Sequence, residues 1–335
     1  MKPVPSIQRI LVFRFSALGD VALTVPVIKK FKNQFPDVEL VVVGTAMHAG
    51  LFKGIDGIQF EGFDLKGTYK GLMGIVRIFR MLRKKYQADA VADLHGVLRT
   101  HVLRFLFWVA GKKVAVIDKG RMEKFALTRK EFKIFRPLAH TTQRYADVFS
   151  RLGFSFQLGD WELLEAVPKK EALRIGFAPF SKHNLKMYSL DKMKEVIRHF
   201  DHGLNKIYVF GGSRAEKLMI QQWEKEFTCI VPMEDGLDLG EEIEIMRGLD
   251  VMVAMDSANM HLASLANIPA ISIWGPTHPY TGFYGYNQNP GFAIQKNLSC
   301  RPCSVFGGKT CWRGDHACMN DIDPSEIISK IGGKS

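Results

Sequence analysis

The chain has 335 residues, of which 47% are hydrophobic and 24% charged, and its formal net charge is +12. This length suffices for two domains with a core each, and the composition, without repeats or low-complexity tracts, excludes a disordered or fibrous protein. The positive charge is concentrated between Lys66 and Arg144, where 19 lysines and arginines occur with only 5 acidic residues.

The first half alternates between strand and helix patterns. Short apolar runs predict strands at Ile10–Phe15, Glu39–Val43, Ala90–Asp93 and Lys113–Ile117. Apolar residues at helical spacing predict helices at Ala22–Asn33, Lys70–Tyr86, Leu98–Ala110 and Thr142–Leu152. The N-terminus lacks the uninterrupted apolar core of a signal peptide, and no stretch reaches the roughly 20 apolar residues of a membrane span. We therefore expect a cytoplasmic protein.

The basic stretch of the first half favours an anionic partner, which is a nucleic acid, an anionic membrane surface or a phosphorylated substrate. Such charges are also typical of solvated helix faces. The segment Arg77–Tyr86 fits both interpretations, because its Ile78, Phe79 and Leu82 are spaced to face a core.

A polar segment at Gly153–Lys170 connects this half to a second alternating series. Its predicted strands are Arg174–Ala178, Lys206–Phe210, Val251–Met255 and Ala270–Trp274. Its predicted helices are Leu190–Phe200, Ala215–Phe227, Gly240–Leu249 and Ser257–Ala266. This order predicts an α/β protein with two doubly wound parallel sheets, a first domain at 1–155 and a second at 172–335, with the active site in a cleft between them.

The segment Val251–Gly285 combines a strand, a polar turn, a helix and a second strand. Asp256 and Ser257 lie where the first strand ends, and the backbone N–H groups that open the next helix are a typical binding site for a diphosphate. A plain helix cap by Asp256 and Ser257 explains the same residues. His261 and the Gly275–Thr277 turn add polar groups at this edge and favour a binding site.

Two further loops carry polar residues at strand ends. Asp20 follows the first strand, and its carboxylate could accept a proton from an attacking hydroxyl or could cap the next helix. Ser181 and Lys186 follow the strand Arg174–Ala178, where a lysine suits a diphosphate leaving group, although most such lysines are only surface residues.

Four separated motifs resemble the lipopolysaccharide heptosyltransferases of glycosyltransferase family nine. They are RILVFRFSALGDVALTVP near the N-terminus, DLHGVLRTH at 93–101, the loop with Lys186, and MDSANMHLASLANIPAISIWGPTHP from Met255. The resemblance spans nearly the whole chain and implies the GT-B fold, with the acceptor on the first domain and an ADP-activated sugar on the second.

The resemblance implies a role for each matching residue. Asp20 corresponds to the general base, and the donor-binding positions are Ser181, Lys186, Glu216, Asp256, Ser257, Ala258 and His261. We place the acceptor against Ser16, Arg99 and Arg121. The sequence departs from the family pattern in three places. Ala258 replaces the usual glycine, which would tolerate a positive φ better, Asn259 follows it, and Tyr188 replaces a tryptophan.

The implied reaction is a single displacement that inverts the sugar, with Asp20 taking the proton of the acceptor hydroxyl as ADP leaves. We expect no cofactor for catalysis, because Lys186 and the helix start at Ser257 can stabilise the leaving diphosphate. The D-x-D pair Asp321 and Asp323, a pattern common in metal-dependent sugar transferases, precedes Pro324 and Glu326 and is interpreted as a capped helix start.

Four of the five cysteines fall in one short segment, at Cys300, Cys303, Cys311 and Cys318. Cysteines two residues apart are the usual half of a structural zinc site, but the second half of this spacing is atypical. Reduced thiols and a labile disulfide are the alternatives.

The leading hypothesis is an inverting transferase that adds heptose from ADP-heptose to the inner core, Kdo-lipid A, of lipopolysaccharide. It would work in the cytoplasm, at the inner face of the cytoplasmic membrane, where the anionic acceptor matches the basic first domain. The alternatives are a transferase for another nucleotide-activated sugar, a nucleotide-sugar-processing enzyme such as an epimerase, and a basic nucleic-acid-binding protein. No nucleic-acid-binding motif is present, so we expect no nucleic acid partner.

Overall fold

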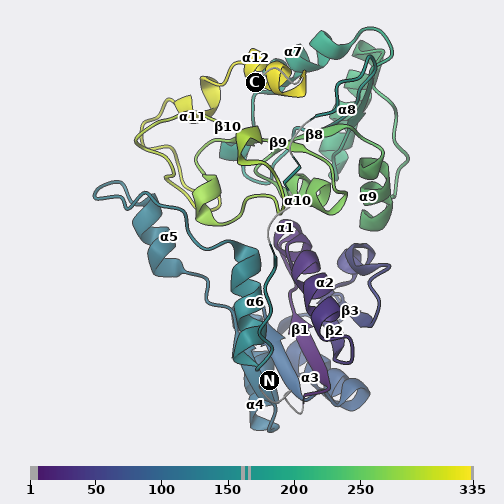
Figure 1. Cartoon of the computed structure of the whole chain (residues 1–335), viewed down its shortest axis with the longest axis vertical. Coiled ribbons are helices and arrows are strands. Elements are labelled where there is room, and N and C mark those ends of the chain that lie inside the picture. Colours follow the sequence, from purple (N-terminus) through teal and green to yellow (C-terminus); the bar gives the residue numbers. More distant parts are fainter. Residues whose placement is uncertain (1–6, 160–162, 165–166, 333–335) are drawn as a thin grey trace. The chain divides into compact units, whose positions relative to one another are not determined.

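The computed structural model describes residues 7–159, 163–164 and 167–332, which form two compact α/β units (Figure 1). The first unit holds the described residues of 7–120 and 141–159 together with 238–240. The second holds those of 121–140, 163–237 and 241–332. No helix among the described residues is long and apolar enough to span a membrane.

The first unit is built on a five-stranded parallel sheet with the strand order β3-β2-β1-β4-β5. Its strands are β1 (Arg9–Phe13), β2 (Glu39–Thr45), β3 (Ile58–Phe63), β4 (Ala90–Asp93) and β5 (Lys113–Val116). In the register, Val12 of β1 lies beside Val42 of β2 and Ala92 of β4. The central strands are buried on both faces, as parallel strands between helices require.

Helices cover both faces of this sheet. They are α1 (Leu18–Ala22), α2 (Thr24–Gln34), α3 (Gly71–Tyr86), α4 (Leu98–Val109) and α6 (Thr141–Arg151), with a 3₁₀ helix η1 at Ala46–Phe52. On one face, Ile78 and Leu82 of α3 and Phe107 of α4 join the core with Phe13 of β1. α2 packs on α6, where the rings of Phe31 and Phe149 are 4.7 Å apart.

The second unit repeats this plan with the strand order β10-β9-β8-β6-β7. Its strands are β6 (Arg174–Ala178), β7 (Lys206–Val209), β8 (Val251–Met255), β9 (Ala270–Trp274) and β10 (Ala293–Gln295). Its helices are α5 (Arg121–Thr128), α7 (Leu190–Phe200), α8 (Arg214–Glu226), α9 (Leu239–Arg247), α10 (Ala258–Leu265), α11 (Ala317–Asn320) and α12 (Pro324–Ile331). The short 3₁₀ helices are η2 (Asn184–Lys186), η3 (Pro279–Thr281) and η4 (Pro290–Phe292).

The predicted fold class, two doubly wound parallel sheets, is confirmed. The helix predicted at Ala22–Asn33 is α2, whereas α1, β3, β10, α5 and α11 were not predicted. β3 contains Glu61 and Gly62 and is only partly buried at the sheet edge, which explains its weak apolar pattern. The connection predicted at 153–170 includes 160–162 and 165–166, which lie outside the described residues.

The sequence placed residues up to 155 in one domain, but the segment 121–140 belongs to the second unit. Within that unit, the backbone N–H of Leu138 donates to the carbonyl of Tyr280 at 3.0 Å, and His140 Nε2 donates to the carbonyl of Tyr284 at 2.8 Å. α5 and the strand-like stretch after it are therefore anchored to the loop that follows β9.

Candidate active site

The polar residues singled out from the sequence gather where each sheet reverses its strand order. In the first sheet this point lies between β1 and β4, and in the second between β6 and β8. The connections that leave the two neighbouring strands run in opposite directions at this point. In open parallel sheets this leaves a crevice at the carboxyl ends of the strands, which is the usual ligand site.

Asp20 lies at this point of the first unit and is held by a nearly buried ion pair. Its Oδ2 is 2.7 Å from Nη2 of Arg14, whose side chain is 7% exposed, while that of Asp20 is 21% exposed. Asp20 is the third residue of α1, not its N-cap as the capping alternative proposed. Its carboxylate accepts a long hydrogen bond, 3.4 Å, from the backbone N–H of Ala17, and its carbonyl accepts one from the Tyr145 hydroxyl.

His95, in the loop after β4, lies among cationic side chains close to Asp20. Burial, Arg14, Lys119 and Arg99 together lower the pKa of His95 to about 3, so the imidazole is neutral at physiological pH. His95 Nε2 lies 3.4 Å from Ser16 Oγ. The predicted acceptor residues Ser16 and Arg99 are thus near Asp20, whereas Arg121 opens α5 of the second unit.

Sequence reasoning missed Arg14, His95 and Lys119 as members of this cluster. Arg14 is anchored by donating from Nη1 to the Leu94 carbonyl at 2.7 Å, and the Asp93 carboxylate accepts from the backbone N–H of His95 at 3.0 Å. Their position immediately after β1, β4 and β5 was the signal that could have identified them.

In the second unit, Lys186 and Asp256 form an ion pair at the reversal between β6 and β8. Nζ of Lys186 is 2.8 Å from Oδ2 of Asp256, and the two side chains are only 12% and 10% exposed. Lys186 ends η2 in the loop after β6, which also carries Ser181, and Asp256 directly follows β8. Two loops far apart in sequence therefore place opposite charges together.

The start of α10 lies beside this pair. Ser257 is the N-cap residue, but its side chain makes no capping hydrogen bond, and among the described residues its buried Oγ has no partner. Ala258 is the first helical residue and is not one of the described residues with positive φ, so the backbone at this position does not require glycine. His261 lies on the next turn and is buried.

Glu216, unlike Asp256, forms hydrogen bonds with the backbone of its own loop. Its Oε2 accepts the backbone N–H groups of Gly212 and Ser213, each at 2.8 Å, and its own N–H donates to Ser213 Oγ at 3.2 Å. This is a capping box at the start of α8. Glu216 thus fixes the loop after β7 through Oε2.

The structural interpretation of the D-x-D pair is confirmed. Asp323 caps α12 by accepting from the N–H of Ser325 at 2.9 Å, and Glu326 accepts the N–H of Asp323 at 2.8 Å. Tyr188, which replaces the family tryptophan, is buried and donates its hydroxyl to the Ile322 carbonyl at 3.0 Å. Tyr188 therefore belongs to the core of the second unit.

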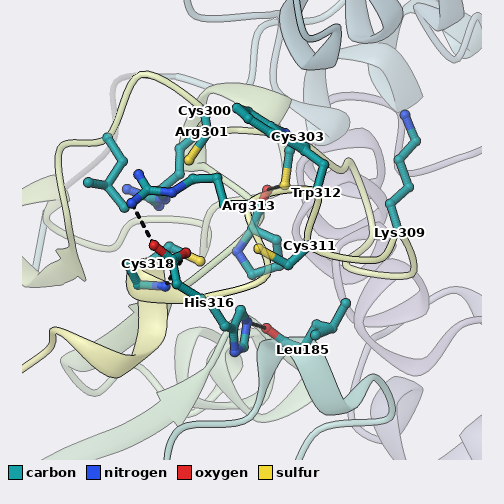
Figure 2. A pocket seen from close by; sticks show the side chains of 14 residues that line it. Leu185, Cys300, Arg301, Cys303, Lys309, Cys311, Trp312, Arg313, His316 and Cys318 are labelled. Carbon is teal, nitrogen blue, oxygen red and sulfur yellow. Dashed lines mark hydrogen bonds and ion pairs between the residues drawn. The ribbon is translucent and has the colours of Figure 1, made fainter.

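The four clustered cysteines line one cavity of about 10 Å³ beyond β9 (Figure 2). All five cysteines of the chain are free thiols. Among the described histidine, cysteine, aspartate and glutamate side chains, no three are already placed to share a metal ion. Burial raises the pKa of Cys318 to about 11.

The turn Gly275–Thr277 is held from the side of this cysteine segment. Arg301 is buried, and burial lowers its pKa to about 10. Its Nε donates to the Gly275 carbonyl at 2.5 Å and its Nη2 to the Thr277 carbonyl at 2.9 Å. The polar turn predicted to extend the site is thus organised by a residue that sequence reasoning did not single out.

Fold and site together define an α/β protein with two parallel sheets, each of which carries charged residues at its ligand-binding edge. Residues 75–309 match the sequence pattern of glycosyltransferase family 9 (heptosyltransferase). The chain belongs to this family, and its enzyme class, glycosyltransferase, and its GT-B fold agree with the resemblance seen in the sequence.

Two relatives match this chain over almost the full length of both sequences. Lipopolysaccharide heptosyltransferase 1 of Pseudomonas aeruginosa is 25% identical, over 97% of this chain and 97% of its own length. Lipooligosaccharide heptosyltransferase 2 of Campylobacter jejuni is 21% identical, over 94% and 95%.

A solved structure of a family 9 glycosyltransferase from Veillonella parvula has a TM-score of 0.73 at 19% identity, with 96% of each chain covered. The E. coli heptosyltransferase WaaC, solved with ADP-2-deoxy-2-fluoro heptose, has a TM-score of 0.66 at 18% identity, over 87% of this chain and 94% of its own.

Proposed function

We propose that the enzyme transfers heptose from ADP-heptose to the inner core, Kdo-lipid A, of lipopolysaccharide. The observation that carries this proposal is the Lys186–Asp256 pair beside the start of α10, found in a chain of family 9. The names of the relatives and of the ligand in the WaaC structure support the same donor and acceptor.

The donor is proposed to bind at the reversal point of the second sheet. Its diphosphate would accept hydrogen bonds from the first N–H groups of α10 and from Ser257 Oγ, and the positive end of the helix dipole favours that charge. Lys186 supplies a full positive charge, Asp256 contacts the sugar, and Ser181, Ala258 and His261 line the same loops. Glu216 shapes the nucleoside side by fixing the loop at Gly212.

The acceptor is proposed to bind at the reversal point of the first sheet. Arg14, Arg99 and Lys119 provide cationic groups for the acidic sugars and phosphates of the acceptor. Ser16 supplies a neutral hydroxyl there, whereas Arg121, which opens α5 of the second unit, stays a predicted acceptor residue. Asp20 is the general base, because Arg14 pairs with its Oδ2 and leaves its second oxygen to accept a proton.

The proposed reaction is a single displacement. The acceptor hydroxyl loses its proton to Asp20 as its oxygen attacks the anomeric carbon, the bond from that carbon to the diphosphate breaks, and the configuration inverts. Charge grows on the departing ADP, where Lys186 and the N-terminus of α10 stabilise it more in the transition state than in the ground state. We propose that catalysis by this route needs no bound cofactor.

The decisive test is Asp20→Asn. Loss of the base should lower the rate of transfer by about a hundredfold or more, since general base catalysis contributes factors of that order. ADP binding by calorimetry and the far-ultraviolet circular dichroism spectrum should stay unchanged, because Asp20 lies outside the proposed donor site.

The matched control is Asp37→Asn, which removes an exposed carboxylate from a turn of the same unit and should have full activity. Full activity of Asp20→Asn would exclude Asp20 as the base. Loss of ADP binding or of folding would instead assign it a structural role.

A further inference from the structure

The segment 121–136, which is α5 and the stretch after it, leaves large apolar side chains in contact with solvent. Five of them are between 48% and 85% exposed: Met122, Phe125, Phe132, Ile134 and Phe135. Apolar residues that are exposed one at a time are ordinary on protein surfaces. A group of them on one short segment marks an interaction site, and the proposed transfer uses none of these five.

The loop 299–316 packs beside this segment. Lys130 Nζ lies 4.7 Å from the centre of the Trp312 ring, and Lys133 Nζ donates to the Cys300 carbonyl at 2.8 Å. The Trp312 side chain is still 51% exposed. Two segments far apart in the sequence therefore lie side by side within the second unit (Figure 1).

Further ring contacts anchor the exposed side chains on the fold. Phe306 is 59% exposed, and its ring lies 5.5 Å from that of Phe283, whose ring centre is 4.2 Å from Lys124 Nζ. The ring of Phe135 lies 5.0 Å from that of Tyr280. Part of each ring is thus held by the protein while the rest faces solvent. We call the exposed apolar and basic side chains of 121–136 and 299–316 the basic aromatic surface.

This surface is positively charged. The segment 121–136 contains six lysines and arginines and two glutamates, and the loop 299–316 contains three basic residues and one acidic residue. Asp315, the acidic residue of the loop, pairs with Arg313, whereas Lys309 is exposed. A second copy of the chain would place like charges opposite each other, which disfavours self-association through this face. The charge instead fits an anionic partner.

We propose that the basic aromatic surface binds an anionic phospholipid membrane. The apolar side chains would enter the headgroup region, and the lysines and arginines around them would contact the lipid phosphates. A single-stranded nucleic acid would use the rings and the cations, but Met122 and Ile134 offer no flat face on which a base can stack. The mixture of aliphatic and aromatic side chains therefore favours lipid.

The surface is joined to the loop that carries Lys186. Gly307 has a φ of +81°, and a Cβ placed on it would lie 2.3 Å from Cδ of Lys186, so the loop 299–316 packs directly on the lysine stem. His316 Nε2 donates to the Leu185 carbonyl at 2.8 Å. A membrane bound at this surface would therefore hold the proposed donor site close to the bilayer. This last consequence rests on the proposed function, whereas lipid binding itself does not.

Binding of the full-length protein to vesicles tests the proposal. Vesicles of phosphatidylglycerol mixed with phosphatidylcholine should sediment the protein, and pure phosphatidylcholine should bind it at least about tenfold more weakly. High salt should reduce binding to the anionic vesicles toward the same low level, because it screens the charges. The vesicles contain neither a sugar acceptor nor a donor, so this result and the outcome of the transfer assay are independent.

The double variant Phe125→Ser, Phe132→Ser should lower the partition coefficient for anionic vesicles about tenfold or more, because two rings no longer leave water. Its matched control is Leu204→Ser, Leu218→Ser, which removes two exposed apolar side chains elsewhere in the second unit and should bind as the unmodified protein does. Calorimetry with ADP should give the same affinity for both double variants, which shows that they are folded.

The cations and the tryptophan have separate readouts. Lys130→Gln combined with Arg136→Gln should weaken binding to anionic vesicles several-fold and leave the weak binding to phosphatidylcholine unchanged. Lipid that carries bromine in its acyl chains should quench the fluorescence of the unmodified protein more than that of Trp312→Phe, because Trp312 would lie at the membrane.

Three results would overturn the proposal. The first is equal binding of the Phe125→Ser, Phe132→Ser variant and the unmodified protein to anionic vesicles, and the second is equal quenching in Trp312→Phe. The third is binding of single-stranded RNA, or a dimer in the absence of lipid, that the same double variant abolishes while vesicle binding is absent. That result would assign the surface to a nucleic acid or to a second copy of the chain.

Discussion

At the scale of single residues, the two ion pairs explain why charged side chains can be nearly buried at both sheet edges. Arg14–Asp20 and Lys186–Asp256 each place full charges in a largely dry environment, at 2.7 and 2.8 Å. Removing one partner of such a pair leaves an uncompensated charge, which costs about 3–5 kcal/mol, whereas the intact pair contributes little net stability. Such pairs are more readily explained by function than by stability.

Lys186→Gln should weaken ADP binding about ten- to a hundredfold, because a hydrogen bond to a charged group contributes about 1.5–3 kcal/mol. Isothermal titration with ADP measures this directly. Lys182→Gln, which changes an exposed lysine of the same loop, should leave the affinity unchanged. Equal affinities for both variants would remove Lys186 from the donor site.

Asp256→Asn is expected to act in the opposite direction on ADP. The variant frees Lys186 from its present partner, so ADP should bind more tightly, while transfer slows because the sugar loses its carboxylate contact. Weaker ADP binding in a folded variant would mean that Asp256 orients Lys186 instead of competing for it. Direct titration, together with initial rates at saturating donor, distinguishes these outcomes.

The sequence predicted that Asp20, Lys186 and Asp256 lie at strand ends, because parallel strands end at a common edge. It could not predict their present partners, since the pairing of Arg14 with Asp20 depends on the side-chain conformations in the loop after β1, and Lys186 and Asp256 lie in two loops far apart in the sequence. Glu216 shows the reverse case, in which S-x-x-E spacing at Ser213 already indicated a capping box.

At the scale of elements, α4 has an unusual outer surface. Its inward face carries Leu103 and Phe107, but Phe105 and Trp108 on the outward side are 58% and 63% exposed, with ring centroids 5.9 Å apart. Lysines follow at once in the turn after the helix. Exposed aromatic rings next to cations are typical of helices that bind an anionic membrane surface, which fits the proposed lipid acceptor.

The double variant Phe105→Ser, Trp108→Ser should therefore reduce binding to vesicles that contain anionic lipid about tenfold or more, as expected for the loss of two buried rings. Sedimentation with vesicles measures the bound fraction. Leu204→Ser, which removes an even more exposed apolar side chain from the second unit, is the control. Unchanged binding of the double variant would exclude this face as the contact.

The elements that the sequence failed to predict share a physical cause. α5 has only eight residues and is followed by a stretch in which Phe132 and Phe135 are exposed, so neither helical period nor alternation was visible. The segment after α5 is joined to the second unit by hydrogen bonds from the Leu138 backbone and the His140 side chain to carbonyls about 140 positions away. A sequence pattern predicts an element where buried residues recur at a regular spacing. Such a regular spacing is lacking in this segment.

At the scale of the whole molecule, histidines with lowered pKa values make stability depend on pH. Burial is the leading cause that lowers the pKa of His95 to about 3, and of His140 and His278 to about 4, from an ordinary value of 6.5. The unfolded chain binds more protons than the native state between these values. The native state therefore has its full stability with respect to these histidines above about pH 6.5. That stability is lost as the pH falls toward 4, because the unfolded chain then takes up protons that the native state does not.

The free energy of unfolding should thus decrease between about pH 7 and pH 5, by at most about 1.4 kcal/mol per pH unit for each histidine. Urea unfolding at several pH values measures the slope. His95→Gln should reduce it, and His202→Gln, at an exposed position, should not. A slope that is identical in His95→Gln and in the unmodified protein would show that other groups dominate this range.

The pairing of Lys186 with Asp256 has a consequence for turnover. Each charge already has a counter-ion, so in the proposed mechanism binding of the diphosphate would exchange one anionic partner of Lys186 for another. Once the sugar had left, the carboxylate would no longer have a hydroxyl to contact and would be able to reclaim the ammonium. The free energy of re-forming the pair would then assist the release of ADP, and Asp256 would act as an internal competitor that clears the site for the next cycle.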